Sequence, residues 1–481
     1  MSHRKNITVL LAFSIFLFFS CTKRISITPE FQLDAGKPLA SLDDADNALT
    51  GAYSGFLDPS YFNGTSEGSP SAFSALPDVM SDDLIETFES LGNFRRYSEW
   101  SYPGDDPFSD SAWLHAYSVV SSVNIILRDI DKLASKDQKA ANRIKGQALA
   151  IRGMVHFDLL RLYAPDLQRN SAALGVPYVK VFDITLKPAR NTVKECYDNI
   201  LADMQQAAGL LADVDKDINT DLDKGHIDLL AVNGLLSRIN LYAGQWQDAV
   251  NAATPVIQNV PLATADDFPN IWTDASVAEV LWSVNFETLA DGAPYDNVYF
   301  PNSDRNTYRP IDDLIALYDQ ANDVRFNAYM ADFGGRLIVS KYVGRGSSFD
   351  GVVNWKALRV SELYLNRAEA NFQMNKQAEA LADLNTLRAA RIDGFTPGTE
   401  SGAALLAAIK TERRKELAFE GGRFFDLKRW GRTPIVRSVC GGSANSPSNV
   451  CTLPSTSRAW AWPIPFNEII ANGNIKQNDG Y

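Results

Sequence analysis

One arrangement of residues occurs twice in this chain: a helix, a tight turn and a second helix. Residues 241–249 read LYAGQWQDA, and residues 372–380 read FQMNKQAEA. Gly244 and Asn375 fall at equivalent places, and both residue types tolerate the left-handed backbone that ends a helix. Apolar residues continue at steps of three and four before and after each turn. The repeat predicts two helix hairpins of the same design.

Helix pairs with small residues where the helices cross are typical of tetratricopeptide-type repeats. Such units bury their apolar faces by stacking, so a chain of 481 residues avoids one oversized core. A third apolar helix face runs through 141–163, and Ala164-Pro165 should end that helix. Thr192 and Glu195 form a capping box that should open another helix. Pro255 is a flaw in the pattern, because it should kink its helix or end it early.

Three stretches do not follow a helical period: 54–112, 261–350 and 431–481. We therefore expect a mainly α fold, in which helix pairs within 113–260 and 355–430 support an irregular, loop-rich lobe. Loops on a rigid scaffold commonly carry the binding residues of a protein.

The N-terminus has the features of an export signal. A basic start precedes an apolar run at 7–19, which is too short to span a bilayer as a helix. Cys21 follows at once, where a bacterial lipoprotein box places its lipidated cysteine; an ordinary signal peptide with a chance cysteine is the alternative. We expect a signal peptide at 1–20, a lipidated tether at 21–40 and the folded domain at 41–481.

The other cysteines predict structure rather than chemistry. Cys196 lies in a helical pattern and should be a buried small apolar residue. Cys440 and Cys451 flank a loop of Gly, Ser, Asn and Pro, and we expect them to form a disulfide in an oxidising compartment. A metal site is the alternative, although no histidine lies near them. The sequence predicts no metal and no cofactor, and a net charge of −12 argues against nucleic-acid binding.

Two aromatic clusters in the irregular stretches are candidate ligand sites. A ring can cover the apolar face of a sugar while arginine binds the hydroxyls at its edge. Each ring could instead fill the core, because large aromatic side chains are mostly buried. The candidate residues are Arg95, Tyr97, Trp100 and Tyr102 in the first cluster, and Tyr295 and Tyr299 in the second.

A dense run of charges at 412–431 has two interpretations. Glu412 and Glu416 share a helix face, and a carboxylate pair could cleave glycosides. The alternative, which we favour, is a salt-bridge network that clamps the last helices onto the lobe, with Arg414 and Arg423 among the partners. Buried charges must be paired, and no carboxylate here stands alone in an apolar setting.

Five blocks of sequence, in this order, resemble the SusD/RagB family of nutrient-binding outer-membrane lipoproteins. The blocks are LTGAY at 49–53, ALAIRGMVHFDLLRLY at 148–163, SELYLNRAEA at 361–370, ERRKELAFEG with RFFDLKRWG within 412–431, and WPIP at 462–465. Together they cover the chain from about residue 40 to its end.

The resemblance implies about four tetratricopeptide-like units beneath the irregular lobe. It implies non-catalytic capture of oligosaccharides, or of peptides in some branches, at the cell surface. The implied partner is a TonB-dependent (SusC-like) outer-membrane transporter, and attachment to the outer membrane is through the lipid. Thr22, Lys23 and Arg24 follow Cys21 where surface-exposed relatives often carry acidic residues, so the sequence leaves open which side of the membrane the chain faces. Two rivals are a secreted glycan-cleaving enzyme and a repeat adaptor that binds only proteins.

Overall fold

The computed structural model describes residues 37–64, 71–214, 218–220, 222–295, 305–346, 349–440 and 446–481. The chain divides into two compact units, Met1–Pro38 and Leu39–Tyr481, and the following description concerns the second. Two of the predicted site residues, Cys21 and Tyr299, lie outside the described residues.

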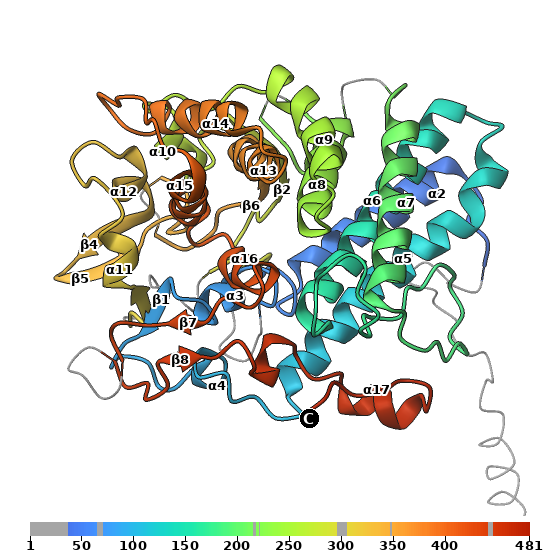
Figure 1. Ribbon diagram of the computed structural model, residues 1–481. Helices are drawn as coiled ribbons and strands as arrows, with labels where there is room; N and C mark the ends of the chain where they lie inside the picture. Colours follow the sequence, from blue (N-terminus) through green and yellow to red (C-terminus); the bar gives the residue numbers. More distant parts are fainter. Residues whose placement is uncertain are drawn as a thin grey trace, which may run out of the picture. The chain divides into compact units, whose positions relative to one another are not determined.

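Helices dominate the second unit, and its strands are short (Figure 1). The helices are α2 Leu42–Ser54, η2 Gly55–Leu57, α3 Ala75–Val79, α4 Arg95–Ser98, α5 Pro107–Leu133, α6 Gln138–Tyr163, α7 Val193–Leu211, α8 Leu229–Tyr242, α9 Trp246–Asn259, α10 Phe268–Ile271, α11 Asp312–Ile315, α12 Val324–Tyr329, α13 Val360–Gln373, α14 Gln377–Ala389, α15 Gly402–Glu416, α16 Arg423–Arg429, η3 Arg458–Trp460 and α17 Phe466–Ala471. The strands are β1 Leu84–Glu86, β2 Val280–Val284, β3 Tyr308–Pro310, β4 Met330–Phe333, β5 Arg336–Val339, β6 Trp355–Arg359, β7 Ile435–Val436 and β8 Thr452–Leu453. The prediction of a mainly α fold is confirmed.

The two predicted hairpins are present and lie against each other (Figure 1). Gly244 turns the chain between α8 and α9 at φ +69°, and Asn375 turns it between α13 and α14 at φ +60°. Leu241, Ala249 and Ala370 form a small core shared by α8, α9 and α13. The hairpin design is therefore confirmed, while the figure of four repeat units stays a prediction.

Local signals set most of the helix ends. The helix α6 stops at Tyr163, just before Ala164-Pro165, as expected. Thr192 caps α7, because its hydroxyl accepts from the Glu195 amide at 3.2 Å and its own amide donates to the Glu195 carboxylate at 2.8 Å. Pro255 does not end its helix early, since α9 continues to Asn259, and the alternative of a kink stays a prediction. The proline is solvent-exposed, so water can satisfy the carbonyl one turn earlier that loses its N–H partner.

The irregular lobe contains four two-stranded antiparallel ladders, β1 with β3, β2 with β6, β4 with β5, and β7 with β8. Long loops connect them, and the lobe draws on segments far apart in the sequence. No helix within the described ranges is long and apolar enough to cross a membrane.

The charged run at 412–431 clamps the last helices onto the lobe, as predicted. Arg414 donates to Asp83 at 2.7 Å, and Arg423 donates to Asp82 at 2.7 Å, so two side chains of this run bind the segment before β1. Glu416 accepts from three arginines that are far apart in sequence, namely Arg325, Arg359 and Arg391. The charged side chains of this run thus join the last helices to other segments of the chain.

His156 on α6 is buried and hydrogen-bonded as a neutral base. The Nδ1 atom of His156 lies 2.8 Å from the Arg152 carbonyl oxygen, and its Nε2 atom accepts from the Val179 amide at 3.0 Å. The first contact therefore requires a proton on Nδ1, and the second requires a bare Nε2, so the ring is neutral. Burial lowers the pKa of His156 to about 4, because a charged imidazole would lose its hydration.

We expect His156 to lower the free energy of unfolding of the protein in mild acid. The pKa of His156 is about 4 in the folded state and about 6.5 in the unfolded chain. Its neutral form therefore supports folding fully above pH 6.5, and this contribution is lost as the pH falls from 6.5 towards 4. Between pH 7 and pH 5 the loss is about 2 kcal/mol. Urea unfolding of the wild type and His156→Gln across this range checks it. The wild type should lose about that much more stability than the variant, and parallel pH profiles would contradict the assignment.

Candidate functional site

The predicted aromatic cluster at 95–102 lies in the core. Tyr97 is 2% exposed, Tyr102 is 1% exposed and Trp100 is also buried. The Trp100 indole donates to the Met80 carbonyl at 2.8 Å, and the Arg437 guanidinium covers its ring at 4.4 Å. The expectation of exposed rings does not hold here, because the C-terminal segment packs over them. Of the four candidate residues in this cluster, Arg95 is the one that remains partly exposed, in a two-point bond to Glu86.

In the second cluster, the structure describes Tyr295, and this ring is also unavailable to a ligand. Tyr295 is buried, donates to Asp78 and stacks on Tyr342 and Trp355, with ring centroids 4.6 and 5.5 Å away.

Cys440 and Cys451 are bonded to each other in the structure, with Cα atoms 5.6 Å apart. Cys196 is buried, as expected. The part of the chain that the structure describes contains no cluster of metal-ligating side chains.

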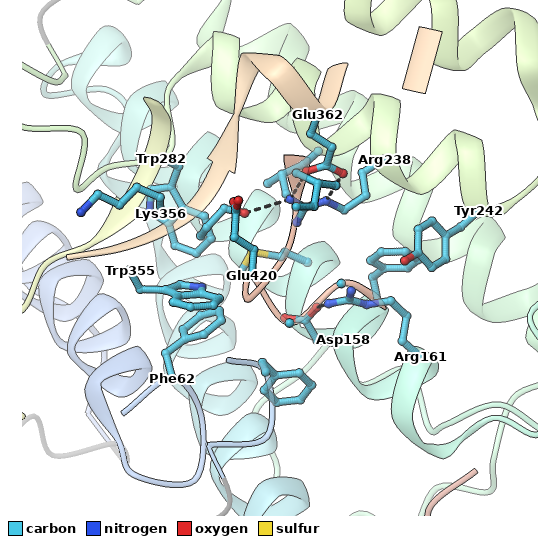
Figure 2. A pocket seen from close by; sticks show the side chains of 18 of the residues that line it. Phe62, Asp158, Arg161, Arg238, Tyr242, Trp282, Trp355, Lys356, Glu362 and Glu420 are labelled. Carbon is cyan, nitrogen blue, oxygen red and sulfur yellow. Dashed lines mark hydrogen bonds and ion pairs between the residues drawn. The ribbon is translucent and has the colours of Figure 1, made fainter. Parts of the chain in front are cut away.

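Figure 2 shows a cavity whose walls are rich in charge. Arg238 and Glu362 face each other across 2.8 Å, and Arg161 pairs with Asp158. The cavity has a volume of about 50 Å³, whereas small-molecule sites typically offer roughly 300 Å³ or more. It can hold a few waters that complete the hydrogen bonds of these side chains. The cavity therefore belongs to the core.

An open groove of about 260 Å³ lies beside α2, where Asn285 and Asp291 line one wall. Its rings are already engaged. The Tyr53 hydroxyl donates to Gln147 at 2.7 Å and accepts from the Ile227 amide at 2.9 Å, while Trp282 is buried. The groove thus offers polar contacts and the partly exposed Tyr53 ring, whose hydroxyl is already hydrogen-bonded.

Exposed large apolar side chains occur instead in the loop-rich segments, and two of them are neighbouring rings. Phe88, Leu91, Phe333 and Phe349 are 60%, 69%, 44% and 44% exposed, and we call these four side chains the aromatic platform. The rings of Phe333 and Phe349 are 6.2 Å apart, at 47° to each other. Apolar side chains that are exposed as a contiguous group can mark a binding surface.

An exposed ion pair links two of the segments that carry the platform. Phe333 ends β4, and Arg336 opposite it begins β5. Arg336 binds Glu89 at 2.8 Å, which brings Phe88 and its neighbours beside this hairpin. Glu89 also accepts from the Asn306 amide at 2.9 Å. The Arg336 side chain, next to the turn that follows Phe333, thus adds a cation to the edge of the platform.

Sequence reasoning missed the platform. A weak signal was present, because Phe333 precedes Gly334-Gly335, a pair that forms tight hairpin turns. A residue beside such a turn at the edge of a sheet is well placed to remain exposed. Phe88 and Phe349 carry no comparable signal.

Solved structures place this architecture in a family. A crystal structure of a SusD superfamily protein from Bacteroides thetaiotaomicron is 30% identical to the chain, with a TM-score of 0.80, and the match covers 91% of this chain and 100% of that one. The chain belongs to the SusD superfamily. The resemblance inferred from the five sequence blocks is confirmed.

Other SusD-related proteins give the same result. A protein from Bacteroides vulgatus described as a putative sugar binding protein is 30% identical, with a TM-score of 0.78, over 92% of this chain and 100% of that chain. SusD-like protein P38 of Formosa agariphila is 22% identical over 99% of both chains. The family profile described as "SusD family" matches residues 336–481, and that described as "Starch-binding associating with outer membrane" matches 62–241.

Proposed function

We propose that this SusD-superfamily protein captures oligosaccharides at the cell surface without cleaving them and delivers them to a TonB-dependent outer-membrane transporter. The observation that carries the proposal is the aromatic platform, in which paired, exposed rings lie beside hydrogen-bonding groups. The description of one matching family as starch-binding, and of a 30% identical relative as a putative sugar binding protein, supports a carbohydrate ligand.

The surroundings of the carboxylates favour binding over cleavage. Glycoside hydrolysis requires two carboxyl groups that flank the scissile bond. Glu89, next to the platform, is paired with Arg336, and Glu86 is buried against Arg95. Glu412 and Glu416 are buried in ion pairs with arginines. These acids are engaged in structure rather than poised towards a ligand.

Removing one platform ring should weaken binding roughly tenfold. Phe333→Ala and Phe349→Ala each delete a contact face worth about 1–2 kcal/mol. Affinity should be weak in the wild type, because an open platform removes little area from water. Calorimetry with a panel of glycans measures both effects.

Phe466→Ala is the matched control, because Phe466 is a similarly exposed phenylalanine outside the platform. It should bind glycans like the wild type. Equal affinities for all four proteins would remove the platform from the site. Binding of peptides but of no glycan would assign the chain to peptide capture instead, and new reducing ends would identify an enzyme.

We also propose that Cys21 carries the lipid that attaches the protein to the outer membrane. Cys21→Ala should move the protein out of the membrane fraction, because the acyl chains contribute about 0.8 kcal/mol per buried CH₂ and the net charge of −12 provides no attraction to anionic lipid. Fractionation in cells that lack the transporter checks this. A variant that stays in the membrane there would contradict the lipid assignment.

A further inference from the structure

An open groove is formed by the long helices α5, α6 and α7, which lie side by side (Figure 1). Residues 124, 127, 128 and 131 of α5 and residues 145, 149 and 152 of α6 line it, and this spacing places each set on one face of its helix. Residues 180–182 and Gln206 of α7 complete the lining. We call it the α5–α6 groove. Its volume of about 420 Å³ falls in the range of roughly 300–1,000 Å³ that small-molecule sites offer.

Hydrogen bonds fix the loop that carries residues 180–182 against the helices. Asn124 donates to the Val179 carbonyl at 3.1 Å, and Arg152 donates to the Lys180 carbonyl at 3.2 Å. The Val179 amide donates to His156 at 3.0 Å. These contacts use the backbone of the loop, so a change of the Lys180 side chain leaves them in place. The groove is therefore preorganised, which lowers the entropic cost of binding a ligand.

Positive charge predominates in the groove. Its lining contains one carboxylate, that of Asp131, and four cationic side chains, those of Arg128, Lys145, Arg152 and Lys180. The first three cations bind carboxylates at 2.6 or 2.7 Å, namely Asp129, Asp131 and Asp203 in that order. Lys132 shares Asp129 with Arg128, at 2.9 Å. Within this group the cations thus outnumber the carboxylates.

Lys180 carries the charge that is left over. Its side chain is solvent-exposed, and the ammonium nitrogen lies 5.6 Å from the centroid of the Tyr178 ring. No carboxylate of the residues that the structure describes lies within 4 Å of it. A cleft with an excess of one sign concentrates ions of the opposite sign. Because the whole chain has a net charge of −12, an excess of cations in one groove is a local feature rather than a general one.

Large apolar side chains line the same groove. Leu149 is buried, Leu127 and Phe182 are half-buried, and Val181 is 56% exposed. An inorganic anion would leave this apolar surface in contact with water, and a neutral apolar molecule would leave Lys180 without a counter-charge. A ligand that joins an anionic group to an apolar body or ring face satisfies both parts of the groove.

We propose that the α5–α6 groove is a binding site for an organic anion, in which Lys180 binds a carboxylate and the apolar side chains cover the body of the ligand. This chemistry is shared by acidic sugars, through their flat C–H faces, and by alkyl acids. The inference is independent of glycan capture at the aromatic platform, because the groove and the platform have no residue in common.

Calorimetry on the full-length chain tests the proposal with two anionic probes, digalacturonate and hexanoate. Their uncharged counterparts are the methyl ester of digalacturonate and 1-hexanol. At least one anion should bind about tenfold more tightly than its counterpart, a difference of about 1.4 kcal/mol. Higher ionic strength should weaken this binding, since salt screens exposed charges. Binding of digalacturonate alone would identify the ligand as an acidic sugar, and binding of hexanoate alone would identify it as an alkyl acid.

Lys180→Glu should weaken binding of the anion at least tenfold. Lys376→Glu is the matched control, because Lys376 is also exposed, lies outside the groove and undergoes the same change of charge. It should bind the anion like the wild type. Val181→Asp is a second test, since it removes apolar surface and places a negative charge next to Lys180. It should also weaken binding, and circular dichroism verifies that each variant is folded.

Three results would overturn the inference: no binding of either anion by the wild type, equal affinity for an anion and its uncharged counterpart, or equal affinities of Lys180→Glu and Lys376→Glu. The outcome is separable from that of the proposed function. Phe333→Ala should keep its affinity for the anion, and Lys180→Glu should bind neutral glycans like the wild type.

Discussion

Replacing Glu416 by glutamine is expected to destabilise the protein by about 3–5 kcal/mol. The Glu416 carboxylate lies 2.9 Å from Arg359, 3.0 Å from Arg325 and 3.1 Å from Arg391, and none of the four side chains is exposed. These arginines hold the pKa of Glu416 well below its usual range. The variant loses one negative charge and leaves three guanidinium groups buried with less compensation. Urea unfolding at neutral pH measures the loss.

Glu400→Gln is the matched control. Glu400 also pairs with an arginine, Arg388, at 2.8 Å, but its side chain is partly open to solvent. Such a pair is worth less than about 1 kcal/mol. If Glu416→Gln lowered the free energy of unfolding no more than Glu400→Gln does, the buried network would contribute less to stability than its geometry indicates.

The charge network around Glu416 shows how much could be predicted from sequence. Dense alternating charge at 412–431 indicates a network, because carboxylates and arginines at helical spacing must pair if they are buried. Two of the predicted members, Arg414 and Arg423, reach Asp83 and Asp82. The partners themselves are hundreds of residues away in the chain, and no local pattern identifies them.

The helix hairpins were predictable for a similar reason. Helix ends depend on neighbours within a few residues, so Gly244 and Asn375 could be placed at turns from the sequence. The family also followed from local blocks, which keep their order along the chain.

Ring exposure could not be predicted in this way. Tyr97 and Tyr102 lie in an irregular stretch, like many ligand-binding aromatics, but Trp462 and Tyr481 pack against them from the far end of the chain. Phe333 also falls in a stretch without a helical period, yet it is 44% exposed at the end of the β4–β5 hairpin. Which ring faces solvent depends on long-range packing. The candidate site therefore had to come from the structure.

Gly421→Ala should cost about 3 kcal/mol of stability, from left-handed strain and overpacking together. Gly421 adopts φ +68°, and a Cβ atom there would lie 2.7 Å from the Ser74 carbonyl oxygen and 3.0 Å from that of Phe73. Both contacts are with backbone, which cannot turn aside as a flexible side chain could. The Gly421 amide also donates to the buried Asp78 at 2.9 Å, which fixes the position of this turn against the lobe.

The neighbouring glycine gives the control. A Cβ atom at Gly422 would meet nothing within 4 Å, and its φ of −94° suits any residue. Gly422→Ala should therefore change the free energy of unfolding by less than about 1 kcal/mol in either direction. Thermal and urea unfolding of the two variants compare the sites directly. Because the substitutions are chemically identical and adjacent, a difference between them reports the close approach of the 421 turn to residues 73–74, and equal stabilities would show that the lobe yields there without cost.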